Sequence, residues 1–331
     1  MTIDTTDNVT QPSSDSMRLA HLPVALFSMS LGLFGLTLVW QEASVVLGAS
    51  ALIGTSLLLL ATAVFTLVGV SYGLKLVRYP DAVIAELRHP IKSSFFATVS
   101  ASLILLGTAL QARLPDLAFI IWALGAATHL LFTVMIINRW MHHEQFEVTH
   151  INPAWFIPAV GNILVPIAGV EFGYPSVAWF FFSIGVVFWL VLLSIIFYRI
   201  FFHAPLPERL LPTLFILIAP PAAGFIAYTQ LISGVDSFAR VQVNIALFFT
   251  LLLVSQLRRF AALSFSLSFW AYSFPLAAMS VAMMRYYQLT DVTWALIVGG
   301  LLTALTSAVI TWLAALTIKA AKHQQICVPE G

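Results

Sequence analysis

Charged residues are scarce in this 331-residue chain. Asp, Glu, Lys and Arg make up 9% of it, whereas they form roughly 25% of an ordinary soluble domain. Apolar residues make up 60%, and the mean hydropathy is +0.96. Because a transmembrane helix needs about 20 mostly apolar residues, this composition predicts many membrane spans within one domain. The net charge is +1 without a cluster of basic residues, which excludes a nucleic-acid-binding surface.

Cysteine and histidine are equally sparse. The single cysteine, Cys327, can form neither a disulfide framework nor a thiolate metal cluster. His129 is the one histidine well inside an apolar segment, and a lone histidine there is more often hydrogen-bonded between helices than a haem or metal ligand. The segment HHEQFE at 142–147 lacks the second histidine of the H-E-x-x-H zinc pattern. We expect no cofactor, no metal and no enzymatic activity, with a membrane haem or metal enzyme using His129 as an alternative.

Ten apolar segments recur along the chain, joined by short polar connections. They cover residues 22–40, 50–74, 93–112, 117–138, 153–171, 176–200, 209–233, 241–256, 264–286 and 292–318. Their lengths predict transmembrane helices, with boundaries good to a few residues. Residues 1–17 are polar and rich in Ser and Thr, and they lack the pattern of a signal peptide. We predict a disordered cytoplasmic tail at 1–20, a ten-helix transmembrane domain at 21–320 and a cytoplasmic tail at 321–331.

Basic residues alternate between the predicted loops in a way that orients the chain. Lys and Arg are enriched in cytoplasmic loops of membrane proteins. With both termini inside, twelve lie on the cytoplasmic side and three outside. The twelve are Arg18, Lys75, Arg78, Arg88, Lys92, Arg139, Arg199, Arg209, Arg258, Arg259, Lys319 and Lys322, and the three are Arg113, Arg240 and Arg285. This bias supports an even number of spans and a multi-pass protein of the cell (inner) membrane.

Prolines divide the segments into two sets. Nine of them fall within or at the start of odd-numbered segments, and we expect none within even-numbered ones. The nine are Pro23, Pro90, Pro153, Pro158, Pro166, Pro212, Pro220, Pro221 and Pro275. Proline frees backbone polar groups, which a membrane tolerates only against other protein or a water-filled cavity. The pattern predicts kinked odd helices inside, around a pore, and straight even helices outside, as five helical hairpins; kinks in a bundle without a pore are the alternative.

Acidic residues are missing from the predicted spans. We expect none of the fourteen Asp and Glu residues inside a span, and we assign Glu42 and Glu171 to outer loops. Intramembrane carboxylates usually mark proton or cation pathways. Their absence argues against such a pathway and against proton coupling through buried acids. Helix N-termini and loop cations can attract an anion without them, and the lumen can be largely apolar.

Five stretches together resemble a known family. They are LPVALFSMSLGLFGLTLVW (22–40), AELRHPIKSSFFA (85–97), INPAWFIPAVGN (151–162), LFILIAPPAAGFIAY (214–228) and SFWAYSFPLAAM (268–279). In this order, each on an odd segment or its entrance, they resemble the tellurite-resistance/C4-dicarboxylate transporter family, which includes the slow anion channel of plant guard cells. The resemblance runs from about residue 20 to 320.

The resemblance implies a pore with a gate. It implies five hairpins, an inner ring of odd helices, and a homotrimer in which each protomer has its own pore. It also implies that Phe274, in the stretch WAYSF, closes the pore. Phe274 precedes Pro275, and a residue before proline is displaced from helical geometry. Further pore-lining or kink candidates are Phe34, Gly35, Gly107, Pro158, Gly161, Pro220, Gly224 and Pro275.

These observations predict a passive, gated anion channel for small inorganic or carboxylate anions. A proton-coupled transporter of C4-dicarboxylates such as malate is the alternative. Detoxifying tellurite by reduction would need thiols or a redox cofactor, so tellurite resistance would be a side effect of anion transport.

Overall fold

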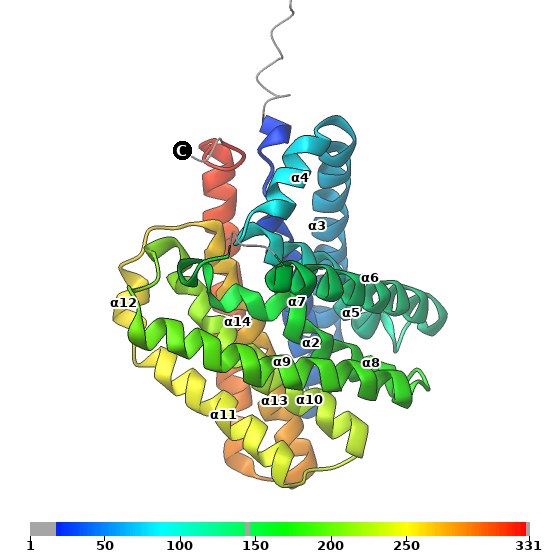
Figure 1. Cartoon of the computed structure of the whole chain (residues 1–331). Coiled ribbons are helices and arrows are strands. Elements are labelled where there is room, and N and C mark those ends of the chain that lie inside the picture. The colour runs from blue at the N-terminus through cyan, green and yellow to red at the C-terminus, as the bar shows by residue number, and fades with distance from the viewer. Residues whose placement is uncertain (1–17, 143–145, 329–331) are drawn as a thin grey trace, which may run out of the picture.

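The computed structural model describes residues 18–142 and 146–328, and these residues form helices and loops without a strand. Residues 1–17 of the predicted N-terminal tail, and His143 and Glu144 of the HHEQFE segment, lie outside the described residues. Figure 1 shows helices throughout the molecule. The chain is an all-α membrane protein, as its composition predicts.

Ten helical spans follow one another along the described chain. In order they are η1–α2 (Val24–Val46), α3 (Ala51–Arg78), η2–α5 (Lys92–Leu110), α6 (Pro115–His142), η4–α8 (Pro153–Gly169), α9 (Pro175–Phe202), η6–α10 (Glu208–Ile232), α11 (Ser237–Val254), η7–α13 (Leu267–Thr290) and α14 (Thr293–Lys322). Nine are long and apolar enough to cross a membrane, and the fifth is a shorter apolar helix. All ten predicted segments therefore correspond to helical spans, within a few residues at most ends.

Burial separates the odd from the even spans. In the four long odd spans, between 67% and 78% of the most apolar window is buried, against 22% to 39% in the five even spans. We call the odd set the inner spans and the even set the outer spans. The inner spans contact one another in a closed ring, in which α2 meets α5, α5 meets α8, α8 meets α10, α10 meets α13, and α13 meets α2. Each inner span also contacts the outer span that follows it.

Every inner span begins with, or contains, 3₁₀-helical turns. These are η1 (Val24–Leu26), η2 (Lys92–Phe96), η4 (Pro153–Trp155), η5 (Gly161–Leu164), η6 (Glu208–Ile218) and η7 (Leu267–Tyr272); in the fifth span they separate α7 (Phe156–Val160) from α8 (Val165–Gly169). Runs of 3₁₀ helix longer than a few residues are uncommon. Pro212, Pro220 and Pro221 explain the eleven-residue η6, since none of them can donate a backbone hydrogen bond.

The proline distribution is less clean than the sequence predicts. The expectation that even spans hold no proline is wrong, because α6 begins at Pro115 and α9 begins at Pro175. At the first position of a helix, however, the missing N–H is one that would be unpaired anyway. Pro115 and Pro175 are the first residues of the long helices α6 and α9. The prolines of the inner spans lie near the places where the backbone changes to or from 3₁₀ geometry.

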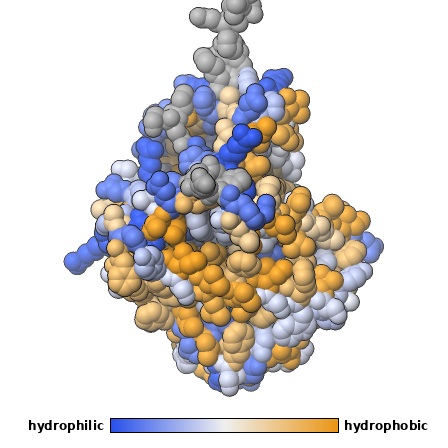
Figure 2. Space-filling model, in the orientation of Figure 1, coloured by the Kyte–Doolittle hydropathy of each residue, from blue (hydrophilic) through white to orange (hydrophobic). Residues whose placement is uncertain are grey.

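The outer surface is apolar around the middle of the molecule. Figure 2 shows hydrophobic side chains across the middle of the visible face, with hydrophilic ones gathered above them near the chain ends. Large exposed apolar residues come from every outer span, among them Leu67, Leu131, Leu190, Phe248 and Leu301. So much exposed apolar surface is suited to lipid rather than water.

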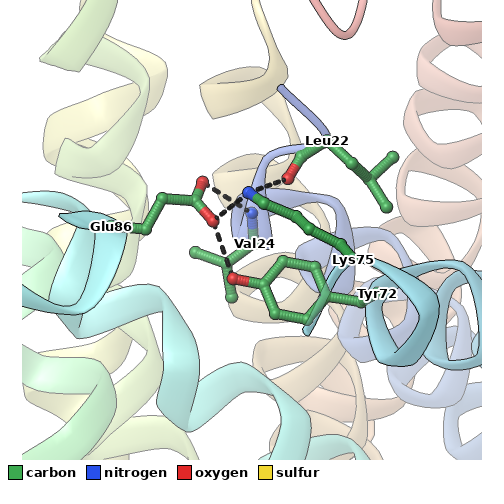
Figure 3. A network of polar contacts seen from close by, with 5 residues as sticks. All are labelled: Leu22, Val24, Tyr72, Lys75 and Glu86. Atoms are coloured by element: carbon green, nitrogen blue, oxygen red, sulfur yellow. Dashed lines mark hydrogen bonds and ion pairs between the residues drawn. The ribbon is translucent and has the colours of Figure 1, made fainter. Parts of the chain in front are cut away.

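A buried ion pair joins the first inner span to its neighbours. Lys75 of α3 lies 2.7 Å from Glu86, and their side chains are only 1% and 11% exposed. Glu86 belongs to a short amphipathic helix, α4 (Pro80–Arg88), which lies in a predicted polar connection between two spans. Its carboxylate also accepts hydrogen bonds from Tyr72 and the Val24 backbone, while Lys75 donates to the Leu22 carbonyl (Figure 3). The network fixes where α2 begins.

This network predicts a stability effect. Glu86→Ala leaves the Lys75 ammonium buried without its partner, and breaking a buried pair from one side costs roughly 3–5 kcal/mol. We expect a clearly lower unfolding temperature of the purified protein in detergent. Asp81→Asn, at an exposed acid of the same helix, is the control and should unfold like the parent. Equal unfolding temperatures for the two variants would show that the pair contributes no stability.

Candidate functional site

Two cavities lie inside the ring of inner spans, and Phe274 lines both. The larger, which we call the vestibule, has a volume of about 180 Å³, and the smaller, the apolar pocket, about 50 Å³. All five inner spans contribute side chains to each cavity. Leu164 and Ala223 also line both. The Phe274 ring, with these two side chains, therefore lies at the boundary between the cavities.

The position of Phe274 follows from its local sequence. It is the second residue of α13 (Ser273–Thr290), directly after η7 and before Pro275. The Ser273 hydroxyl donates a hydrogen bond of 2.5 Å to the Trp270 carbonyl, which holds the junction of the two helix types. Gly35 of α2 (Phe27–Val46) leaves room for the ring, since a Cβ there would lie 3.3 Å from Phe274 Cδ2 and 3.0 Å from the Ala277 Cβ.

The wall of the apolar pocket carries no polar side chain among the described residues that line it. The residues are Leu31, Ala101, Phe156, Ile157, Val160, Gly161, Ile163, Leu164, Ile216, Ala219, Pro220, Ala223 and Phe274. An ion entering this space would lose hydration without gaining a side-chain partner, which is costly. The pocket is thus an apolar space with the Phe274 ring in its wall.

The vestibule instead ends in a polar ring to which all five inner spans contribute. The polar side chains are Gln41 and Glu42, Thr108 and Gln111, Glu171, Gln230, and Arg285. The Arg285 guanidinium donates to the Gln230 side-chain oxygen at 2.7 Å, and the Gln230 amide donates to Glu171 at 2.8 Å. Arg285 therefore places one fixed positive charge at the vestibule, linked through an amide to one carboxylate.

Glu42 lies inside the first inner span. The expectation that no acid lies inside a span is wrong, because α2 continues to Val46 and includes Glu42. The apolar segment ends at Trp40, but the helix runs on for more than a turn. Glu42 is partly buried, and its Oε1 atom has no hydrogen-bond partner in the described part of the chain. Asp116 and Glu208 also fall within spans, but only in their first turns.

The remaining candidates divide between the cavities and the helix contacts. Gly35 lines the vestibule, and Gly161 and Pro220 line the apolar pocket. Phe34 lies edge-to-face on Phe65 of α3. Gly107 faces Trp122 of α6, and Gly224 faces Gln242 of α11 (Ser237–Val254). These three contact outer spans and line neither cavity; nor do Pro158 and Pro275, which lie within the short helix α7 and the first turn of α13.

His129 lies behind the wall of the apolar pocket. It is fully buried, and its Nδ1 is 2.8 Å from the Ser100 hydroxyl. The ring faces Gly161, where a Cβ would come within 2.6 Å of it. It lines neither cavity, and within residues 18–142 and 146–328 no three His, Cys, Asp or Glu side chains form a group that could hold a metal ion. Its contacts are those of a residue that packs inner spans against α6.

Comparison with known proteins identifies a family. A profile of the SLAC1 family, described as voltage-dependent anion channels, matches residues 21–318. The chain belongs to this family. It is 28% identical over 307 residues to the S-type anion channel SLAH2 of Arabidopsis thaliana, covering 91% of this chain and 58% of the plant protein.

Prokaryotic relatives are also found. The chain is 26% identical over 287 residues to a tellurite resistance protein TehA homolog of Haemophilus influenzae, covering 85% of this chain and 84% of that protein. It is 29% identical over 245 residues to an uncharacterised transporter of Methanocaldococcus jannaschii, covering 65% and 70%. The chain spans about half the length of the plant channels SLAH2 and SLAH3, at 58% and 48%.

The tight fit of Gly161 predicts the effect of a methyl group. In Gly161→Ala the new Cβ would meet a His129 ring that is fully buried and bonded to Ser100. Overpacking of this kind costs about 1–3 kcal/mol, so the unfolding temperature should fall. Gly69→Ala in α3, where a Cβ meets nothing within 4 Å, is the control and should be neutral or slightly stabilising. If both variants unfold alike, the His129 ring moves aside freely.

Proposed function

We propose that this protein is a passive, gated anion channel whose pore runs through the ring of inner spans. The observation that carries the proposal is the place of Phe274 between two cavities that all five inner spans line. A phenyl ring there fills the passage and leaves no room for the hydration shell of an ion. The family to which the chain belongs supports an anion as the permeating species.

The charges along the proposed path favour anions that bind weakly. Arg285 supplies the one cation among the residues that line the vestibule, beside the acids Glu42 and Glu171, and the apolar pocket beyond Phe274 offers no charged side chain among the residues that line it. The cation attracts an anion and the acids weaken that attraction, while the apolar path does not retain an anion. Such a combination suits rapid passage rather than tight binding.

The orientation and assembly are also proposals. We propose that both termini are cytoplasmic, so that the vestibule opens outside; the twelve-to-three bias of basic residues supports this. The described ends of the chain lie on the same side of the molecule (Figure 1). Labelling of cysteines placed in the 233–236 loop by an impermeant reagent tests this orientation. A homotrimer in the inner membrane rests on the family resemblance.

The gate is tested by removing its bulk. Phe274→Ala should raise the anion flux of reconstituted protein severalfold or more, and Phe274→Leu should be intermediate, because a shorter side chain reopens the passage. The measurement is chloride or nitrate current in planar bilayers or oocytes. A folded Phe274→Ala protein that conducts no more than the parent would contradict the gate.

Phe269→Ala provides the matched control. Phe269 lies in the same span, is buried against Tyr272 and Trp312, and lines neither cavity. Its truncation should lower the unfolding temperature without raising conductance. An increase equal to that of Phe274→Ala would show that loosening the helix packing, rather than removing the ring from the path, opens the pore.

Proton-coupled transport of C4-dicarboxylates is a second candidate, because Glu42 is an acid inside a span that lines the vestibule. The two functions differ in their driving force. For a channel, flux driven by an anion gradient in vesicles should persist when an ionophore abolishes the pH gradient. Loss of flux under that treatment would favour the coupled carrier.

A further inference from the structure

We infer that the vestibule is a binding site for one small monovalent anion, in which Arg285 provides the positive charge and Glu42 must be protonated for the anion to stay. The inference deepens the proposed channel function and rests on it. It gives two residues opposite effects on the same step: Arg285 holds the anion, and the ionised Glu42 carboxylate repels it.

The contacts of Arg285 leave its charge available to the cavity. Its guanidinium donates to the amide oxygens of Gln230 and Gln288, at 2.7 Å and 3.4 Å. Both partners are neutral, and within the described chain the only ion pair closer than 4 Å is that of Lys75 and Glu86. Neither Glu42 nor Glu171 therefore cancels the Arg285 charge by direct contact, although all three side chains line the vestibule.

The two carboxylates differ in how well they are held. Glu171 accepts a hydrogen bond of 2.8 Å from the Gln230 amide. The Oε1 atom of Glu42 is buried and has no partner among the described residues. Gln288 and the Arg285 charge act on the same carboxylate from α13. A proton on the unpartnered Oε1 would occupy that oxygen without breaking a hydrogen bond already present. Glu42 is thus the acid to which we assign proton binding in the vestibule.

The charges that line the vestibule determine the effect of protonating Glu42. With both acids ionised, Arg285, Glu171 and Glu42 sum to a net charge of −1; with Glu42 protonated, the sum is zero. A negative cavity opposes an anion, whereas a neutral one with a guanidinium in its wall accepts it. Because the lining is then neutral, a bound anion adds its own charge, and a monovalent anion is opposed less than a dianion.

Neighbouring elements add little to this balance. Arg113, after α5 (Ala97–Leu110), donates to Thr55 of α3 and does not line the vestibule. Asp291 lies in the turn between α13 and α14, and Tyr286 and Tyr287 lie near the end of α13. Arg240 of α11 donates to the Tyr286 hydroxyl at 3.3 Å and Asp236 caps α11, and neither lines the vestibule. The halves of α3 and α14 that adjoin this end of α2 contain no charged residue, and neither does α10 (Ala219–Ile232). The sign of the vestibule is therefore decided by the protonation of Glu42.

The inference is tested in vesicles containing the Phe274→Ala channel, so that the constriction does not limit flux. Chloride flux is measured with equal pH on both sides, from about pH 5 to about pH 8, a range that covers a carboxyl in partly desolvated surroundings. Flux should fall on the order of tenfold as pH rises. Adding Glu42→Gln should keep flux high at every pH, because the amide cannot ionise.

Two further variants complete the design. Asp116→Asn removes an exposed acid at the start of α6, outside the vestibule, and should retain the pH dependence of Phe274→Ala. Arg285→Gln should lower flux by about tenfold or more at every pH, since it removes the attracting charge. Size-exclusion profiles and unfolding temperatures establish that each variant is folded.

The outcomes separate the two claims. Folded Phe274→Ala protein without anion flux at any pH would overturn the proposed channel itself. Flux that does not vary with pH, or that titrates equally in the Glu42→Gln variant, would overturn the role of Glu42 while leaving the channel intact. If Glu42→Gln does not fold, the pH dependence of Phe274→Ala and the loss in Arg285→Gln still decide the inference, and the absence of either contradicts it.

Discussion

The structure depends on one constraint, that backbone polar groups within a membrane must find partners inside the protein. Prolines at positions 158, 166, 220, 221 and 275 each lack the N–H that would bond the carbonyl four residues earlier. The carbonyls of Ala154, Asn162 and Ile216 accept instead from residues two or three positions further on, because hydrocarbon can supply no hydrogen bond. Spans with such breaks must therefore lie where protein or water reaches the backbone, and the burial of the inner spans meets that requirement.

The same constraint explains why the cavities lie where they do. Where an inner span changes from 3₁₀ to α geometry, its side chains rotate relative to one another, because the two helices have 3.0 and 3.6 residues per turn. Phe274 occupies such a junction between η7 and α13, next to Leu164 at the junction of η5 and α8. The boundary between the two cavities thus lies where two inner spans change helix type.

The sequence alone predicts the spans, because hydropathy over about 20 residues is a strong signal. It predicts Phe274 only through the resemblance to a known family. It could not separate small residues that line a cavity from those that admit a neighbour: Gly35 lies beside Phe274, whereas Gly107 admits Trp122. Helical spacing would have helped more. Glu42 lies two turns beyond Gly35, so these two residues share one face of α2. Arg285 lies three turns beyond Phe274, so these two share one face of α13. The apolar segment ending at Trp40 concealed Glu42, since hydropathy marks apolar runs rather than helix ends.

The two ends of the proposed path have different physical requirements. Near Phe274 an ion must be excluded when the channel is closed, and an apolar ring does this whatever the sign of the ion. At the vestibule the sign must be recognised, which requires charge. A lone Arg285 would recognise anions but would also hold them, slowing their release. In the proposed site an ionised Glu42 carboxylate would weaken that hold, so that selectivity and release would depend on the balance of two side chains rather than on either alone.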